Sequence, residues 1–136
     1  MIEKWAKRTR IYEGFSVMPY TCPTGHLTIG YGHNLENGIS QEAAEFILRE
    51  DLQAAKNAVQ KKYAWWRTLD EARQFVLVDM AFNMGINKLA TFKKTLAAVE
   101  KGNYTTAARE MLNSRWATQV GRRARELAEI MITGEY

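Results

Sequence analysis

The sequence predicts an α+β fold that is mostly helical. Apolar residues recur at helical spacing over most of the 136 residues, which is typical of amphipathic and buried helices. One segment near the N-terminus departs from this pattern, because glycines stand there among residues that favour strands. Together these observations predict two lobes, a small N-terminal β-hairpin lobe and a helical C-terminal lobe around a long buried helix.

The N-terminal elements are expected to be a helix followed by a strand pair. Residues 2–13 place apolar side chains among charges, which predicts a short amphipathic helix that ends near Glu13. Residues 19–33 then combine glycine with strand-forming residues. A hairpin is the simplest structure for that segment.

The remaining elements are predicted to be helices. Ser40 is a typical N-cap for a long helix over residues 41–61. Thr68 and Glu71 have the spacing of a capping box, and the apolar residues that follow lie on nearly every side. We therefore expect this segment to be the buried central helix, ending at Gly85. Further helices are predicted over residues 89–99, 105–113 and 122–132.

Length and composition favour one globular domain over residues 1–136. The net charge of +4 favours anionic partners such as nucleic acid, membrane surfaces or acidic cell-wall polymers. The single cysteine excludes an intramolecular disulfide, and no metal-ligand motif or cofactor motif stands out. No N-terminal signal peptide and no membrane-spanning run is recognisable.

Three residues suited to acid catalysis lie in and just before the predicted hairpin. Glu13 is followed nine positions later by Cys22 and six after that by Thr28. We expect Glu13 at the groove between the lobes, where partial burial favours the protonated carboxyl of a general acid. Cys22 and Thr28 are placed on neighbouring arms of the hairpin to hold a water molecule. This arrangement suits hydrolysis of a glycosidic bond with inversion, although glutamates at helix ends and lone cysteines are also common without any chemical role.

The spacing of these residues resembles the signature of the phage-type lysozymes, the glycoside hydrolase family of tailed-phage endolysins. That signature is glutamate, eight residues, aspartate or cysteine, five residues and threonine, and residues 28–33 match the family's TxGxGH element. The likeness continues through residues 81–85, 114–116 and 119–124. It therefore covers nearly the whole chain in the right order.

The resemblance implies a single lysozyme-like catalytic domain and an endo-acting N-acetylmuramidase, which cleaves the β-1,4 bond between N-acetylmuramic acid and N-acetylglucosamine in peptidoglycan. Glu13 is then the proton donor, while Cys22 and Thr28 position or activate the attacking water. Much of the family has aspartate in place of Cys22. Because an unperturbed thiol is mostly neutral at neutral pH, a base role requires surroundings that favour the thiolate. Nucleophilic attack by Cys22, with retention, is the alternative mechanism.

The resemblance also implies roles for residues outside this triad. The family's histidine equivalent to His33 pairs with an aspartate on the next long helix, so we expect a structural ion pair with Asp51 in preference to a catalytic histidine. Arg123 matches an arginine that pairs with the catalytic glutamate, which opposes the effect of burial on its proton. An arginine-rich stretch of this kind is also typical of a solvated helix face.

Asn83, Gln119 and Arg123 are the positions expected to bind or orient substrate. An amide and an indole suit N-acetyl groups and sugar faces, so Asn83 and Trp116 fit a groove wall. A structural role fits them as well, and for Trp116 we favour core packing.

Peptidoglycan glycan strands are the expected partner, and the basic charge would draw the enzyme toward an anionic cell wall. Nucleic-acid binding would be indicated by a stripe of basic residues interleaved with aromatic residues, and the sequence shows no such stripe. We expect a monomer without stable membrane insertion, held in the host bacterial cytoplasm before release to the cell wall by a separate pore-forming protein. The rival hypothesis is a catalytically impaired peptidoglycan-binding or regulatory protein of the same fold, and Cys22 is the residue that keeps it open.

Overall fold

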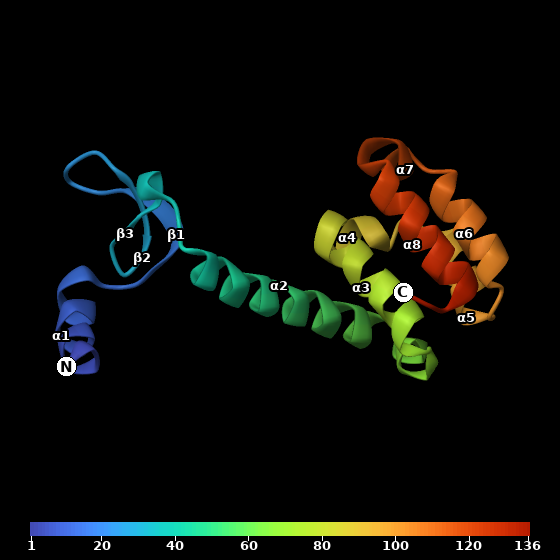
Figure 1. Cartoon of the computed structure of the whole chain (residues 1–136), viewed down its shortest axis with the longest axis horizontal. Coiled ribbons are helices and arrows are strands. Elements are labelled where there is room, and N and C mark those ends of the chain that lie inside the picture. Colours follow the sequence, from blue (N-terminus) through green and yellow to red (C-terminus); the bar gives the residue numbers. More distant parts are fainter. The chain divides into compact units, whose positions relative to one another are not determined.

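The computed structural model describes all residues from 1 to 136 and divides into two compact units (Figure 1). The first unit comprises Met1–Phe46 and the second Ile47–Tyr136. The fold is mostly helical with one small antiparallel sheet, so the predicted α+β class is confirmed.

The first unit contains the N-terminal helix and the sheet. Helix α1 (Ile2–Glu13) ends where Gly14 takes a positive φ of 68°. The strands that follow are β1 (Ser16–Thr21), β2 (Leu27–Gly30) and β3 (His33–Asn34), and the short 3₁₀ helix η1 is Leu35–Asn37. The sheet has the order β1-β2-β3, so the predicted hairpin is present and a short third strand extends it.

A tight turn joins β1 to β2. The N–H of Gly25 donates to the carbonyl of Cys22 at 2.8 Å, and the N–H of Cys22 donates to the carbonyl of His26 at 2.9 Å. Pro23 occupies the second position of this turn, where its fixed φ is favourable, and Gly25 has a φ of +87°. No residue other than glycine has a positive φ, so Thr24 fits a type I turn followed by a left-handed glycine.

Helix α2 (Gln41–Lys62) begins as predicted. The hydroxyl of Ser40 accepts a hydrogen bond from the N–H of Ala43 at 3.1 Å, which is the contact of an N-cap. A second 3₁₀ helix, η2 (Ala64–Thr68), follows it.

Helix α3 (Glu71–Met84) is the buried helix of the second unit, as the apolar pattern predicts, and it ends at Gly85. Its predicted N-cap was wrong by two residues. Asp70, not Thr68, accepts the hydrogen bond from the N–H of Arg73. Thr68 belongs to the preceding 3₁₀ helix, where its hydroxyl donates to the carbonyl of Trp65 at 2.7 Å.

The predicted helix over residues 89–99 is two helices, α4 (Ile86–Leu89) and α5 (Lys93–Glu100). The chain turns at Phe92, whose ring packs edge-on against Trp116. Three helices complete the second unit, namely α6 (Tyr104–Leu112), α7 (Arg115–Val120) and α8 (Arg122–Thr133). Helix α7, which has six residues and is capped by Ser114, was not predicted.

One apolar core lies within the second unit. Side chains of α3 meet those of the later helices there, and α8 lies beside α6 (Figure 1). The largest fully buried side chains are Leu77, Met80, Leu89, Met111 and Met131. Trp116 is 2% exposed, so its predicted role in core packing is confirmed.

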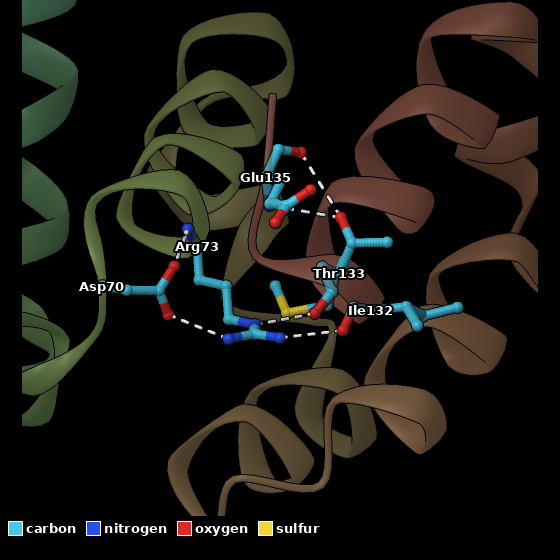
Figure 2. Close-up of polar contacts among 6 residues, drawn as sticks. Asp70, Arg73, Ile132, Thr133 and Glu135 are labelled. Atoms are coloured by element: carbon cyan, nitrogen blue, oxygen red, sulfur yellow. Dashed lines mark hydrogen bonds and ion pairs between the residues drawn. The ribbon is translucent and has the colours of Figure 1, made fainter.

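Arg73 ties the first turn of α3 to the end of α8 (Figure 2). Its Nε donates to the carbonyl of Met131 and its Nη2 to that of Ile132, both at 2.8 Å. Its Nη1 donates to Asp70 at 3.0 Å, and the guanidinium lies 3.7 Å from the centroid of the Tyr104 ring. One cation therefore satisfies carbonyls at a helix C-terminus that have no partner within the helix.

The same contacts act on Asp70. Burial raises the pKa of Asp70, but hydrogen bonds from the side chain and backbone of Arg73 outweigh it and leave the pKa below its ordinary value. A lowered pKa in the folded state stabilises the fold above the unfolded-state pKa. That stabilisation is lost as the pH falls through the folded-state pKa.

We predict that Arg73→Lys lowers the free energy of unfolding by about 2 kcal/mol, because an ammonium group cannot reach both carbonyls and Asp70 together. Arg122→Lys is the matched control, since Arg122 is exposed and pairs only within α8, with Glu126. Its effect should stay within about 0.5 kcal/mol. Urea unfolding of both variants checks the prediction, and equal stability of the two would contradict it.

Candidate active site

All three predicted catalytic residues belong to the first unit. Glu13 is the last residue of α1, Cys22 is the first residue after β1, and Thr28 lies within β2. The sheet pairs Tyr20 with Thr28 and Thr21 with Leu27. Cys22 and Thr28 therefore lie near the same end of the β1-β2 pair.

The carbonyl of His26 connects Cys22 to Thr28. It accepts the backbone N–H of Cys22 at 2.9 Å and the hydroxyl of Thr28 at 2.8 Å. Because one oxygen receives both bonds, the hairpin fixes the backbone of Cys22 relative to the side chain of Thr28. This supports the predicted neighbourhood of the two residues.

The thiol of Cys22 has surroundings that favour the thiolate. A hydrogen bond with the hydroxyl of Thr24, at 3.1 Å from Sγ, makes the largest contribution, followed by backbone hydrogen bonding from His26. Burial opposes them, yet the pKa of Cys22 falls from 9.0 to about 6. The thiolate is thus the main form at neutral pH, which is the condition that a base role requires.

Thr28 is 4% exposed, and its hydroxyl proton is directed to the carbonyl of His26. A hydroxyl that donates in this way keeps its lone pairs as acceptors. Thr28 also adds the smallest of the hydrogen-bond effects on the pKa of Cys22. Because a hydroxyl has one proton, the 2.8 Å bond to the carbonyl of His26 occupies it.

Glu13 lies against Gly32, the second glycine of the TxGxGH element. Gly32 has a φ of +77°, and a Cβ built on it would stand 2.5 Å from Oε2 of Glu13 and 2.8 Å from its Cδ. The carboxyl group therefore occupies the space that a side chain at position 32 would take. Glu13 is an exposed residue of the first unit, and its burial at a groove between the lobes stays a prediction.

The two histidines have polar partners in the first unit. Nε2 of His33 lies 2.8 Å from the carbonyl of Gly38, and Nδ1 of His26 lies 2.6 Å from Oε2 of Glu36. The pair between His26 and Glu36 was not predicted, and it joins residues ten positions apart whose connecting segment contains β2 and β3. Asp51 is an exposed residue of α2, and its ion pair with His33 stays a prediction.

Arg123 forms a bidentate ion pair with Asp79 of α3. Its Nε and Nη2 each donate to one carboxylate oxygen at 2.8 Å. Hydrogen bonding to Asp79 raises the pKa of Arg123, so the guanidinium stays charged. The interpretation of Arg123 as one of a set of freely solvated arginines is therefore wrong, while its pairing with Glu13 stays a prediction.

Asn83 follows Asp79 by one helical turn, and its Oδ1 accepts the indole N–H of Trp116 at 2.8 Å. Gln119 is exposed on α7. Asp79 was missed by the sequence analysis, although a signal was available. Asp79 and Asn83 stand at i and i+4 among the apolar residues of the second half of α3, which places them on one side of the helix.

The second unit also contains a basic pocket of about 530 Å³ between the start of α5 and the α6–α7 connection. Trp116 and Phe92 form part of its wall, and Glu110 is the acidic residue that lines it. Its basic lining residues are Lys88, Lys93, Lys94 and Arg115.

Comparison with known proteins shows which family the chain resembles. The model of the phage lysozyme family matches residues 10–129. Probable T4-type lysozyme 1 of Dictyostelium discoideum is 26% identical over 90% of this chain and 89% of its own length. Probable T4-type lysozyme 2 of the same organism is 30% identical over 81% of this chain and 66% of its own length. An endolysin of Acyrthosiphon pisum secondary endosymbiont phage 1 is 29% identical over 89% of this chain and 84% of its own length.

The fold and these matches define a glycoside hydrolase, a lysozyme-like hydrolase of peptidoglycan. The chain belongs to the phage lysozyme family. The predicted family, enzyme class and general substrate are thereby confirmed. No helix has the length and apolar character needed to cross a membrane.

We predict that Gly32→Ala abolishes most activity while Gly38→Ala does not. Both glycines have a positive φ, +77° and +73°, so each alanine should cost about 1–2 kcal/mol of backbone strain. Only at Gly32 does the new Cβ meet Glu13, because nothing lies within 4 Å of the one at Gly38. The displaced carboxyl should reduce the rate on the order of 100-fold.

Urea unfolding and the clearing rate of permeabilised cells measure these effects separately. Similar losses of stability with different losses of activity are the expected pattern. Equal activity of the two variants would show that the position of the Glu13 carboxyl does not depend on Gly32.

Proposed function

We propose that this protein is an endolysin, an endo-acting N-acetylmuramidase that hydrolyses the β-1,4 bond between N-acetylmuramic acid and N-acetylglucosamine. Glu13 acts as general acid, and Cys22 and Thr28 hold and activate the attacking water. The observation that carries the proposal is the Cys22 site. Its thiol pKa is about 6 and its backbone shares the carbonyl of His26 with Thr28.

In this mechanism, the water oxygen attacks the anomeric carbon on the face opposite the leaving group. The thiolate of Cys22 accepts one proton of the water, while the lone pairs of Thr28 accept a hydrogen bond from it. The glycosidic C–O bond breaks as Glu13 gives its proton to the leaving oxygen. Exchange of protons with solvent then restores the Cys22 thiolate and the Glu13 carboxylic acid.

The second unit would bind and orient the glycan strand. We propose that Asn83 and Gln119 contribute amide hydrogen bonds and that Arg123 orients Glu13. The ion pair with Asp79 is compatible with this role, because it fixes the guanidinium plane. The basic pocket beside Trp116 would accept carboxylates of the peptide part of the substrate.

For the whole protein we propose one catalytic domain that acts as a monomer, without nucleic acid as partner. A lytic enzyme of this kind would remain in the host cytoplasm until a separate pore gives it access to the wall. The rival hypothesis is an impaired peptidoglycan-binding or regulatory protein, and the thiolate-favouring surroundings of Cys22 argue against it.

We predict that Glu13→Gln abolishes lysis, because an amide cannot protonate the leaving oxygen. The measurement is loss of turbidity of permeabilised Gram-negative cells, with the parent protein beside it. Glu3→Gln is the matched control, since Glu3 is an exposed residue of the same helix, 3.9 Å from Arg10. An inactive parent would favour the impaired protein, and an active Glu13→Gln variant would exclude Glu13 as the acid.

We predict that the first product released is the α-anomer. Attack by water on the face opposite the leaving group inverts the β configuration at the anomeric carbon. Proton NMR of a peptidoglycan oligomer during early hydrolysis measures the anomer before it equilibrates. A β-anomer as the first product would instead indicate attack by Cys22 itself through a covalent intermediate.

A further inference from the structure

We infer that Thr24 is a positioning residue for the reaction, because its hydroxyl donates a hydrogen bond to Sγ of Cys22 and holds the sulfur where it can take a proton from water. This inference rests on the proposed function of Cys22. It assigns a task to a residue of the turn that lies outside the glutamate, cysteine and threonine signature.

The direction of the bond follows from the charge on sulfur. Oγ1 of Thr24 and Sγ of Cys22 are 3.1 Å apart, and either atom can donate while the thiol is neutral. A thiolate has no proton, so in the charged state the hydroxyl of Thr24 must be the donor. A donor to the charged form stabilises that form.

The turn keeps Thr24 in place although its side chain is exposed. Pro23 restricts the backbone before it, and Gly25 closes the turn through its hydrogen bond to the carbonyl of Cys22. The turn places the Cα of Thr24 beside Cys22, and in this structure its hydroxyl lies 3.1 Å from the sulfur.

Thr24 and Thr28 have different hydrogen-bonding roles toward the proposed water. The proton of Thr28 is directed to the carbonyl of His26, which leaves its lone pairs to accept from the water. In the thiolate state the hydroxyl of Thr24 donates to the sulfur and stabilises its charge, and the remaining lone pairs of the sulfur can accept from the same water. Two threonines of one hairpin thereby supply opposite hydrogen-bonding functions.

Hydrogen bonds alone lower the pKa of Cys22, and no charged side chain contributes to the shift. The titratable side chains that lie near the turn are His26, at the turn itself, and Glu36 of η1, and Nδ1 of His26 lies 2.6 Å from Oε2 of Glu36. The hydroxyl of Thr24 is the largest contribution among these hydrogen bonds. Its removal should therefore be visible in the titration of the thiol.

The experiment compares Thr24→Val with Thr24→Ser, which restores a hydroxyl, and with Thr21→Val, a matched change at an exposed residue of β1. Cys22 is the single cysteine, so the pH dependence of alkylation by iodoacetamide reports one thiol. In Thr24→Val the pH midpoint of Cys22 alkylation, called the thiol midpoint below, should rise by about 1 pH unit. This rise lowers the thiolate fraction at pH 6 about fivefold. Thr24→Ser and Thr21→Val should keep the parent midpoint. Circular dichroism checks that each variant is folded.

The second measurement is the acid limb of the pH–activity profile, with Cys22→Ser tested in parallel. The inference is supported if thiol midpoint and acid limb move upward together in Thr24→Val and return in Thr24→Ser. An unchanged thiol midpoint in folded Thr24→Val overturns it and leaves the proposed function standing if Cys22→Ser is inactive. A shifted thiol midpoint with an unmoved acid limb overturns the role of Thr24 in the reaction, and with an active Cys22→Ser it also removes Cys22 as the base.

Discussion

The carbonyl oxygen of His26 is the contact on which the rest of the site depends. It receives the backbone N–H of one proposed catalytic residue and the side-chain hydroxyl of another. Both bonds exist only in one register of the hairpin, and the Pro23–Gly25 turn selects that register. A backbone group cannot be changed by substitution, so the relation between Cys22 and Thr28 tolerates variation in the side chain at position 26.

The surroundings of Cys22 and Glu13, the proposed base and acid, differ in kind. The Cys22 sulfur is surrounded by donors from a tight turn, which is the arrangement that an aspartate in an Asx-turn uses. A cysteine can therefore replace an aspartate there and remain negatively charged. The carboxyl of Glu13, by contrast, occupies space that is free because residue 32 is a glycine without a side chain. Hydrogen bonds lower the pKa of Cys22, whereas the space left by Gly32 determines the position of the Glu13 carboxyl.

The sequence predicted those features that follow from local chemistry. Ser40, the apolar pattern of α3 and the glycines of the hairpin each determine a structure within a few residues. The sequence-based predictions were wrong where a tertiary contact determines the local structure. Thr68 has the spacing of a cap, but its hydroxyl bonds to Trp65, and Asp70 caps α3 because Arg73 also holds its carboxylate.

In the site, too, features set by residues close in sequence were predicted and features set by distant residues were not. The Glu13, Cys22 and Thr28 spacing was recognisable because all three lie on one continuous segment. The partners of His26 and Arg123 were not, because Glu36 and Asp79 approach them only after the chain has folded. The break between α4 and α5 is similar, since Phe92 leaves helical geometry where it packs against Trp116.

Arg73 gives the helical unit a property that neither of its joined helices would have alone. A C-terminal helix usually frays first, because its last carbonyls bond only to water. Here those carbonyls bond to a side chain of the helix at the centre of the core. The last turn of α8 is thereby joined to the same cooperative opening unit as α3. Amide protons in the last turn of α8 should then exchange with solvent at rates set by the unfolding of the core.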